Sequence, residues 1–223
     1  MPSMFLSKYF FAKTIVIDEG YLEEISWQSD LRFDDLDESS FLKELAWVVL
    51  SSGMKERVVR NLFGMISNCF FNWKSAKLIV DNEDQCFYEA IRYFNNKPKI
   101  SAIIDSAWKI NSIGFSQLKK MVRENPIETL QEFSYIGPIT VYHLAKNIGL
   151  PLAKPDRHLT RIAKLEGYSD VQTFCNEISK ISGDSIPVVD IVLWRFATIE
   201  KDYLNVLSEV GNSCEFIEKS LGA

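Results

Sequence analysis

The chain has 223 residues, 47% of them apolar, which is enough to bury a sizeable core in one compact, possibly bilobed unit. Its apolar runs fall far short of the roughly 20 residues that cross a bilayer, so no membrane role is expected. The formal net charge is −5, but residues 51–183 alone hold 18 Lys and Arg against 13 Asp and Glu, which indicates either an anion-binding face or unevenly distributed solvated charge.

The first 38 residues show little helical periodicity. The segment KTIVID at 13–18 favours a short strand, and the acidic segment DDLDESS is typical of a loop that ends in a helix cap. Helical spacing dominates the rest of the chain, with core stripes at Phe41, Leu45, Val48 and Val49; at Val59, Leu62, Phe63, Ile66 and Phe70; and at Ile100, Ile103, Ile104 and Ala107. Further helices are predicted around 84–95, 115–124, 170–181, 187–199, 201–211 and 213–221. The pattern predicts an all-α protein of about ten short helices.

The segment 125–148 predicts two helices joined by a tight turn. Asn125 and Pro126 have the residue types of an N-cap and a first helical position, and they start a short helix through Glu132. In the following FSYIGP, Gly137 supplies permissive backbone geometry and Pro138 can open the next helix. The N–H groups around this turn would then point out of a helix N-terminus, where the partial positive charge favours a phosphate. The alternative is an ordinary corner between two helices.

A basic helix is predicted a dozen residues further on. Leu159, Ile162 and Ala163 define its apolar face, and its polar side carries Arg157, Arg161 and Lys164. Asp156 is the natural N-cap of this helix. Taken alone, a capping aspartate is a structural residue.

The order of these elements resembles the helix-hairpin-helix DNA glycosylase superfamily (HhH-GPD). The hairpin FSYIGPITV at 133–141 is similar to the family pattern L-P-G-V/I-G-x-K/R-T-A, and PDRHLTRI at 155–162 is similar to V/P-D-x-H/N-V/I-x-R-V/I. The stretch ELAWVVLSSGMKERVVRNLFGMI also looks like the segment that places a wedge residue in DNA. The resemblance covers roughly residues 40–200 and implies a two-lobed fold: residues 39–150 with the hairpin, and residues 1–38 packed with 151–223.

By this resemblance, Asp156 is the catalytic residue. A fixed carboxylate beside C1′ can stabilise an oxocarbenium-like sugar and orient a water, once the target base has been flipped out of the duplex. The expected DNA contacts are Ile136, Gly137, Ile139, Thr140, Lys154, Arg157, His158, Arg161 and, as the wedge, Met54, although a plain interhelical turn is the alternative for Met54. The candidate base pocket is Tyr142, Asp190, Trp194 and Trp27. For Asp190 the alternative is a structural partner such as Arg195 or Arg161.

The sequence departs from the family pattern at three places. Ile139 stands where bifunctional members carry a Schiff-base lysine, so no strong lyase activity is expected unless Lys146 or Lys154 substitutes. Tyr135 replaces the first hairpin glycine, which leaves open the hairpin's shape and a structural monovalent cation there. The third departure is at the C-terminus, where the cysteines of an iron–sulfur cluster are absent.

Cofactor and compartment follow from the remaining residues. The four cysteines have neither metal-finger nor disulfide spacing, and the two histidines have no ligand spacing, so no catalytic metal and no cofactor is expected beyond the structural cation left open at the hairpin. Nothing N-terminal resembles a secretory signal, which predicts a reduced, cytoplasmic protein. A monomer that associates with the nucleoid when bound to DNA is expected.

The expected function is a monofunctional glycosylase that acts on double-stranded DNA in base-excision repair. Three alternatives stay open: a glycosylase that removes modified bases of phage DNA in antiviral defence, a strand-nicking lyase, and a non-catalytic helix-hairpin-helix module that binds DNA. The excised base is not predicted by the sequence.

Overall fold

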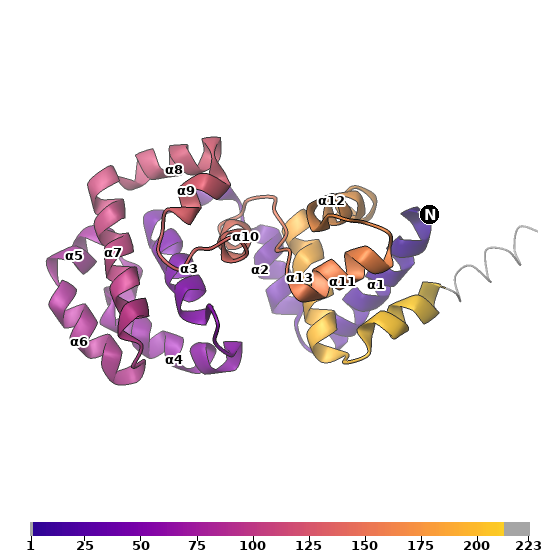
Figure 1. Cartoon of the computed structure of the whole chain (residues 1–223), viewed down its shortest axis with the longest axis horizontal. Helices are drawn as coiled ribbons and strands as arrows, with labels where there is room; N and C mark the ends of the chain where they lie inside the picture. Colours follow the sequence, from indigo (N-terminus) through magenta and orange to yellow (C-terminus); the bar gives the residue numbers. More distant parts are fainter. Residues whose placement is uncertain (1, 212–223) are drawn as a thin grey trace, which may run out of the picture. The chain divides into compact units, whose positions relative to one another are not determined.

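A computed structural model describes residues 2–211, with side chains from Phe5 onward, and every regular element in that range is a helix (Figure 1). The all-α prediction is thereby confirmed for the described residues. The chain divides into two compact units. Arg32–Ile148 forms the central unit, and the segments up to Leu31 and from Gly149 onward form the terminal unit.

The segment 32–38, predicted to belong with the N-terminus, lies in the central unit. Its contacts explain why. Lys119 Nζ donates hydrogen bonds to the main-chain oxygens of Asp34 (2.6 Å) and Leu36 (2.8 Å), and it lies 5.8 Å from the ring centroid of Phe33. These contacts attach the segment to the helix that carries Lys119.

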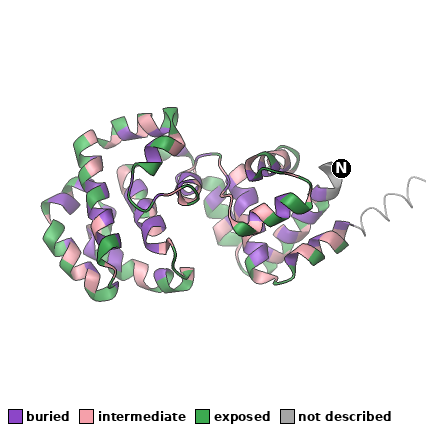
Figure 2. Cartoon of the chain, viewed as in Figure 1, coloured by how far each residue is buried: buried purple, intermediate pink, exposed green. Residues whose placement is uncertain are grey.

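The central unit is built around one long helix. Its elements are η1 (Phe33–Asp35), α3 (Glu38–Ser51), α4 (Glu56–Cys69), η2 (Phe71–Trp73), α5 (Ala76–Asp81), α6 (Glu83–Tyr93), α7 (Lys97–Ile113), α8 (Phe115–Glu124), α9 (Pro126–Gln131) and α10 (Thr140–Asn147). Helix α7 packs against α3, α5, α6 and α8, because the predicted apolar stripes of α3 and α7 are buried. In α4, Leu62 and Phe63 are only half-buried. Figure 2 shows buried, intermediate and exposed residues along the helices of this unit.

The terminal unit has a different centre, α13. Its helices are α1 (Pro2–Asp18), α2 (Leu22–Asp30), α11 (Arg157–Leu165), α12 (Val171–Ser182) and α13 (Ile186–Ile199), and residues 203–211 are also helical. Helix α13 packs against α1, α2, α11 and α12. It can occupy this place because its sequence is apolar on nearly every side, which is typical of a buried helix.

Residues 13–18, predicted as a strand, are the last part of α1. The strand prediction rested on the β-branched run Thr14–Ile17. Four buried side chains override it: Phe5, Tyr9, Ala12 and Val16 follow the helical spacing and pack into the core of the terminal unit. Helices α1, α2 and α5 were not predicted, and the helix expected at 213–221 lies outside the described residues.

Candidate nucleic-acid interface and active site

The predicted hairpin joins α9 to α10 in the central unit, and one hydroxyl group organises it. Thr140 Oγ1 accepts a hydrogen bond from the Gly137 N–H (2.7 Å) and donates one to the Tyr135 main-chain oxygen (3.0 Å). The Ile136 N–H donates to Phe133 O at 3.1 Å. The turn is therefore held by local bonds whose donors and acceptors lie within eight residues, from Phe133 to Thr140.

Tyr135 takes the backbone conformation that a glycine would take. Its φ is +67°, in the left-handed region, at the position where the family pattern has its first glycine. Gly137, expected to supply the permissive geometry, does not have a positive φ. The substitution at 135 thus keeps a glycine-like hairpin and accepts backbone strain on the order of 1 kcal/mol.

The hairpin exposes Ile139 and buries Ile136. The Ile139 side chain is 45% exposed, whereas that of Ile136 is 3% exposed and belongs to the core. The Gly137 N–H is engaged by Thr140, but no bond among the described residues uses the N–H of Ile139 or Thr140. A phosphate would therefore meet two free main-chain donors at the start of α10, in the positive field of the helix N-terminus.

The loop between α3 and α4 carries the expected wedge. Gly53 has φ +67°, the Met54 N–H donates to Ser51 O at 3.0 Å, and the Met54 side chain is 40% exposed. We call residues 52–54 the wedge loop. An exposed apolar side chain on a tight turn suits insertion between bases.

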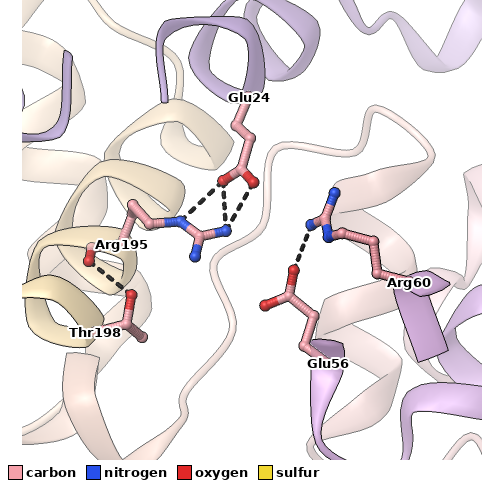
Figure 3. A network of polar contacts seen from close by, with 5 residues as sticks. All are labelled: Glu24, Glu56, Arg60, Arg195 and Thr198. Carbon is pink, nitrogen blue, oxygen red and sulfur yellow. Dashed lines mark hydrogen bonds and ion pairs between the residues drawn. The ribbon is translucent and has the colours of Figure 1, made fainter. Parts of the chain in front are cut away.

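A basic cluster that the sequence analysis did not single out follows the wedge loop. Lys55, Arg57 and Arg60 are exposed on the first turns of α4. Arg60 pairs with Glu56 (Figure 3) and lies 5.7 Å from the Trp47 ring centroid. The run KERVVR directly after the wedge loop was the available signal. These cations extend the positive surface next to Met54.

In the terminal unit, Asp156 caps α11 as predicted. Its Oδ1 accepts hydrogen bonds from the N–H groups of His158 (2.9 Å) and Leu159 (3.1 Å). Its Oδ2 has no hydrogen-bond partner among the described residues, and the side chain is half-buried. Oδ1 therefore fixes the orientation of the carboxylate, and Oδ2 stays available as a hydrogen-bond acceptor or negative charge.

The chain that leads into Asp156 is fixed by two side chains from other helices. Gln172 accepts from the Ala153 N–H (3.0 Å) and donates to Pro151 O (3.3 Å). Asp190 Oδ2 accepts from the Lys154 N–H at 2.6 Å. Because the Asp190 side chain is 2% exposed, its place is the support of this segment rather than the base pocket.

The three aromatic candidates for the base pocket belong to two different units. Figure 3 shows Arg195, which pairs with Glu24 through Nε (3.0 Å) and Nη2 (2.7 Å). Its guanidinium lies 4.7 Å from the Trp194 ring centroid. Trp194 is therefore engaged within the terminal unit, where Trp27 is exposed on α2. Tyr142, half-buried on α10, lies in the central unit.

His158 is an uncharged neighbour of Asp156 at neutral pH. Burial holds the pKa of His158 below its usual value, with a smaller opposing effect of Asp156 and a further lowering by Arg157. Its Nε2 accepts a hydrogen bond from Arg157 Nε at 3.2 Å. The other ring nitrogen, Nδ1, is buried and has no hydrogen-bond partner among the described residues, so the imidazole offers no accessible N–H to a phosphate. Arg157 and Arg161 are exposed.

The predicted site residues fall into two groups. The hairpin residues and Met54 lie in the central unit, and Asp156, Lys154, Arg157, His158 and Arg161 lie in the terminal unit. Gln172, Lys55, Arg57 and Arg60 join these groups as residues that the sequence analysis missed. For Gln172 the sequence offered no signal, because its partners are main-chain atoms 19 and 21 residues away.

No set of three or more possible metal ligands gathers among residues 2–211, and no helix there combines the length and apolar character that a bilayer crossing requires. The structural cation at the hairpin stays a prediction. Comparison of the chain with known protein families and with curated proteins gave no match.

Proposed function

We propose that the chain is a monofunctional DNA N-glycosylase that uses Asp156 to release a damaged or modified base from duplex DNA in base-excision repair. The observation that carries the proposal is the carboxylate of Asp156, with Oδ1 held by two N–H groups and Oδ2 free, at the head of a basic helix. The two hydrogen bonds orient the group before the substrate arrives, so no reorganisation is needed during the reaction.

Each oxygen of Asp156 has its own task in the proposed reaction. The bond between C1′ and the base breaks with its electron pair leaving on the base, and positive charge develops on the sugar. Oδ2 stabilises that charge and orients the water whose oxygen bonds to C1′, and the proton that this water loses ends on the departing base, while Oδ1 stays in the helix cap. Arg157 and Arg161, exposed on the same helix, hold flanking phosphates.

In this proposal, the central unit binds the phosphates of the duplex. The free N–H groups of Ile139 and Thr140 bind one phosphate, and Lys55, Arg57 and Arg60 bind others. Met54 fills the gap that the flipped base leaves.

A strand-cutting lyase is not part of the proposal. The exposed side chain at position 139 is an isoleucine, which cannot form a Schiff base. Lys146, one possible substitute, is buried in the central unit. Borohydride trapping on abasic DNA tests this directly, and a trapped complex would contradict it.

The test is base release from a panel of duplexes that carry deaminated, oxidised, alkylated and hypermodified bases, measured by mass spectrometry. Asp156→Asn should keep the helix cap and DNA binding and abolish release, because asparagine caps as well as aspartate but carries no charge. Asp170→Asn is the matched control, since Asp170 caps α12 through the Thr173 N–H in the same unit (2.6 Å). Release by Asp156→Asn at the wild-type rate would refute the catalytic assignment.

The second candidate is a helix-hairpin-helix module that binds DNA without chemistry. The cap favours it in one respect, because two hydrogen bonds already give Asp156 a structural role. Silence of the wild type across the whole panel, with salt-dependent DNA binding retained, would select this function. Release of a hypermodified base alone would instead select the defence role.

A further inference from the structure

Lys99 is a buried lysine in the first turn of α7. The residue is 4% exposed. Its Nζ donates hydrogen bonds to the main-chain oxygens of Leu50 (2.7 Å) and Ser52, at the end of α3. A cation suits the negative end of a helix, but its burial is costly, and burial indeed lowers the pKa of Lys99.

The same ammonium group also contacts the hairpin. It lies 5.6 Å from the ring centroid of Tyr135, within the range of a cation–π contact. Tyr135 is the residue with φ +67° that shapes the hairpin. One side chain from α7 therefore touches both the first residue of the wedge loop and the turn that precedes α10.

This link matters for the proposed DNA contacts. If the wedge loop were ordered only on insertion, that ordering would cost conformational entropy at the moment of base flipping. A loop fixed beforehand avoids that cost, in the way that preorganised groups favour a reaction. The offset between Met54 and the phosphate-binding N–H groups is then set by Lys99 and Tyr135.

Resting on the proposed function, we propose that Lys99 is a positioning residue that fixes the wedge loop relative to the hairpin, so that Met54 enters DNA at a set offset from the bound phosphate. Lys99 touches no DNA itself in this arrangement. Its loss should affect gap filling and leave attraction to an intact duplex unchanged.

The experiment compares binding of the full chain to two duplexes of one sequence, one intact and one with a tetrahydrofuran abasic analogue. The wild type should prefer the abasic duplex, because Met54 fills the gap. Lys99→Met should reduce that preference by about tenfold and leave the affinity for the intact duplex unchanged. Lys97→Met, an exposed lysine two positions earlier on the same helix, is the matched control and should behave as the wild type.

A double-mutant cycle separates positioning from general stability. Met54→Ala should lose the same preference as Lys99→Met, and the double variant should lose no more than either single one. Additive losses, or a full preference in Lys99→Met, would overturn the inference while leaving the proposed function standing. Absence of wild-type DNA binding would overturn both.

Folding of the variants is checked by thermal unfolding. Should Lys99→Met fail to fold, Lys99→Gln replaces it, since the amide can still donate to one of the two carbonyl oxygens but offers no cation to Tyr135. Lys99→Gln should also weaken the preference for the abasic duplex. A wild-type preference in this variant would count against the inference in the same way.

Discussion

At position 135 a tyrosine occupies a left-handed backbone conformation that favours glycine. Substitutions at this position should therefore change the free energy of unfolding according to how well the new residue tolerates that conformation. Tyr135→Gly relieves strain but loses the contact with Lys99 and loosens the unfolded chain, so its free energy of unfolding should change by less than about 1 kcal/mol. Tyr135→Val keeps the strain, worsened by β-branching, and should destabilise by about 1–3 kcal/mol. Urea denaturation compares the two, and equal values would show that the left-handed geometry is not required.

His158 makes stability depend on pH. Because burial lowers its pKa in the folded state, the unfolded state binds the proton more readily, and stability falls as the pH drops through the usual value of 6.5. The wild type should therefore be less stable at about pH 5 than at about pH 7.5. His158→Asn should flatten that dependence, because it removes the titrating imidazole. Urea midpoints at the two pH values measure it, and an unchanged slope in His158→Asn would contradict the assignment.

At the scale of the helix, Asp156 and Asp170 offer two caps of one type in one unit. Replacement by alanine should cost about 1 kcal/mol at either position, and replacement by asparagine only a few tenths, because asparagine also accepts the N–H bonds. Denaturation of the four variants checks this. A large loss in Asp156→Asn would mean that its charge, and not only its cap, stabilises the fold.

The elements differ in how far the sequence predicted them. The cap at Asp156 was predictable because its partners lie two and three residues ahead. The helical end of α1 was not predictable, because its β-branched residues favour a strand. The helix is stabilised instead by the packing of its buried side chains into the core of the terminal unit. The bonds of Asp190 to the Lys154 N–H and of Lys99 to the end of α3 join distant segments, and such partners have no local sequence signal. Tyr135 was flagged as a departure, but its side chain gives no hint of a positive φ.

For the whole molecule, the proposed function requires that a chain with net charge −5 bind a polyanion. The positive charge is concentrated in residues 51–183, which include the cluster after the wedge loop and the exposed face of α11. Because local fields steer binding, DNA affinity should fall steeply as salt rises, with a log–log slope of about −0.9 for each phosphate contact.

Single substitutions can count those contacts. Arg161→Gln should reduce the slope by about one contact, because its exposed guanidinium faces solvent on the basic helix. Lys180→Gln, which removes an equal charge from α12 where Lys180 pairs with Glu177, should leave the slope unchanged. Equal slopes for all three proteins would mean that α11 does not meet the phosphates. If Arg161→Gln and Lys180→Gln weakened DNA binding equally, the net charge of the chain, and not the exposed face of α11, would determine the affinity. The acidic ends of the chain would then weaken DNA binding by long-range repulsion.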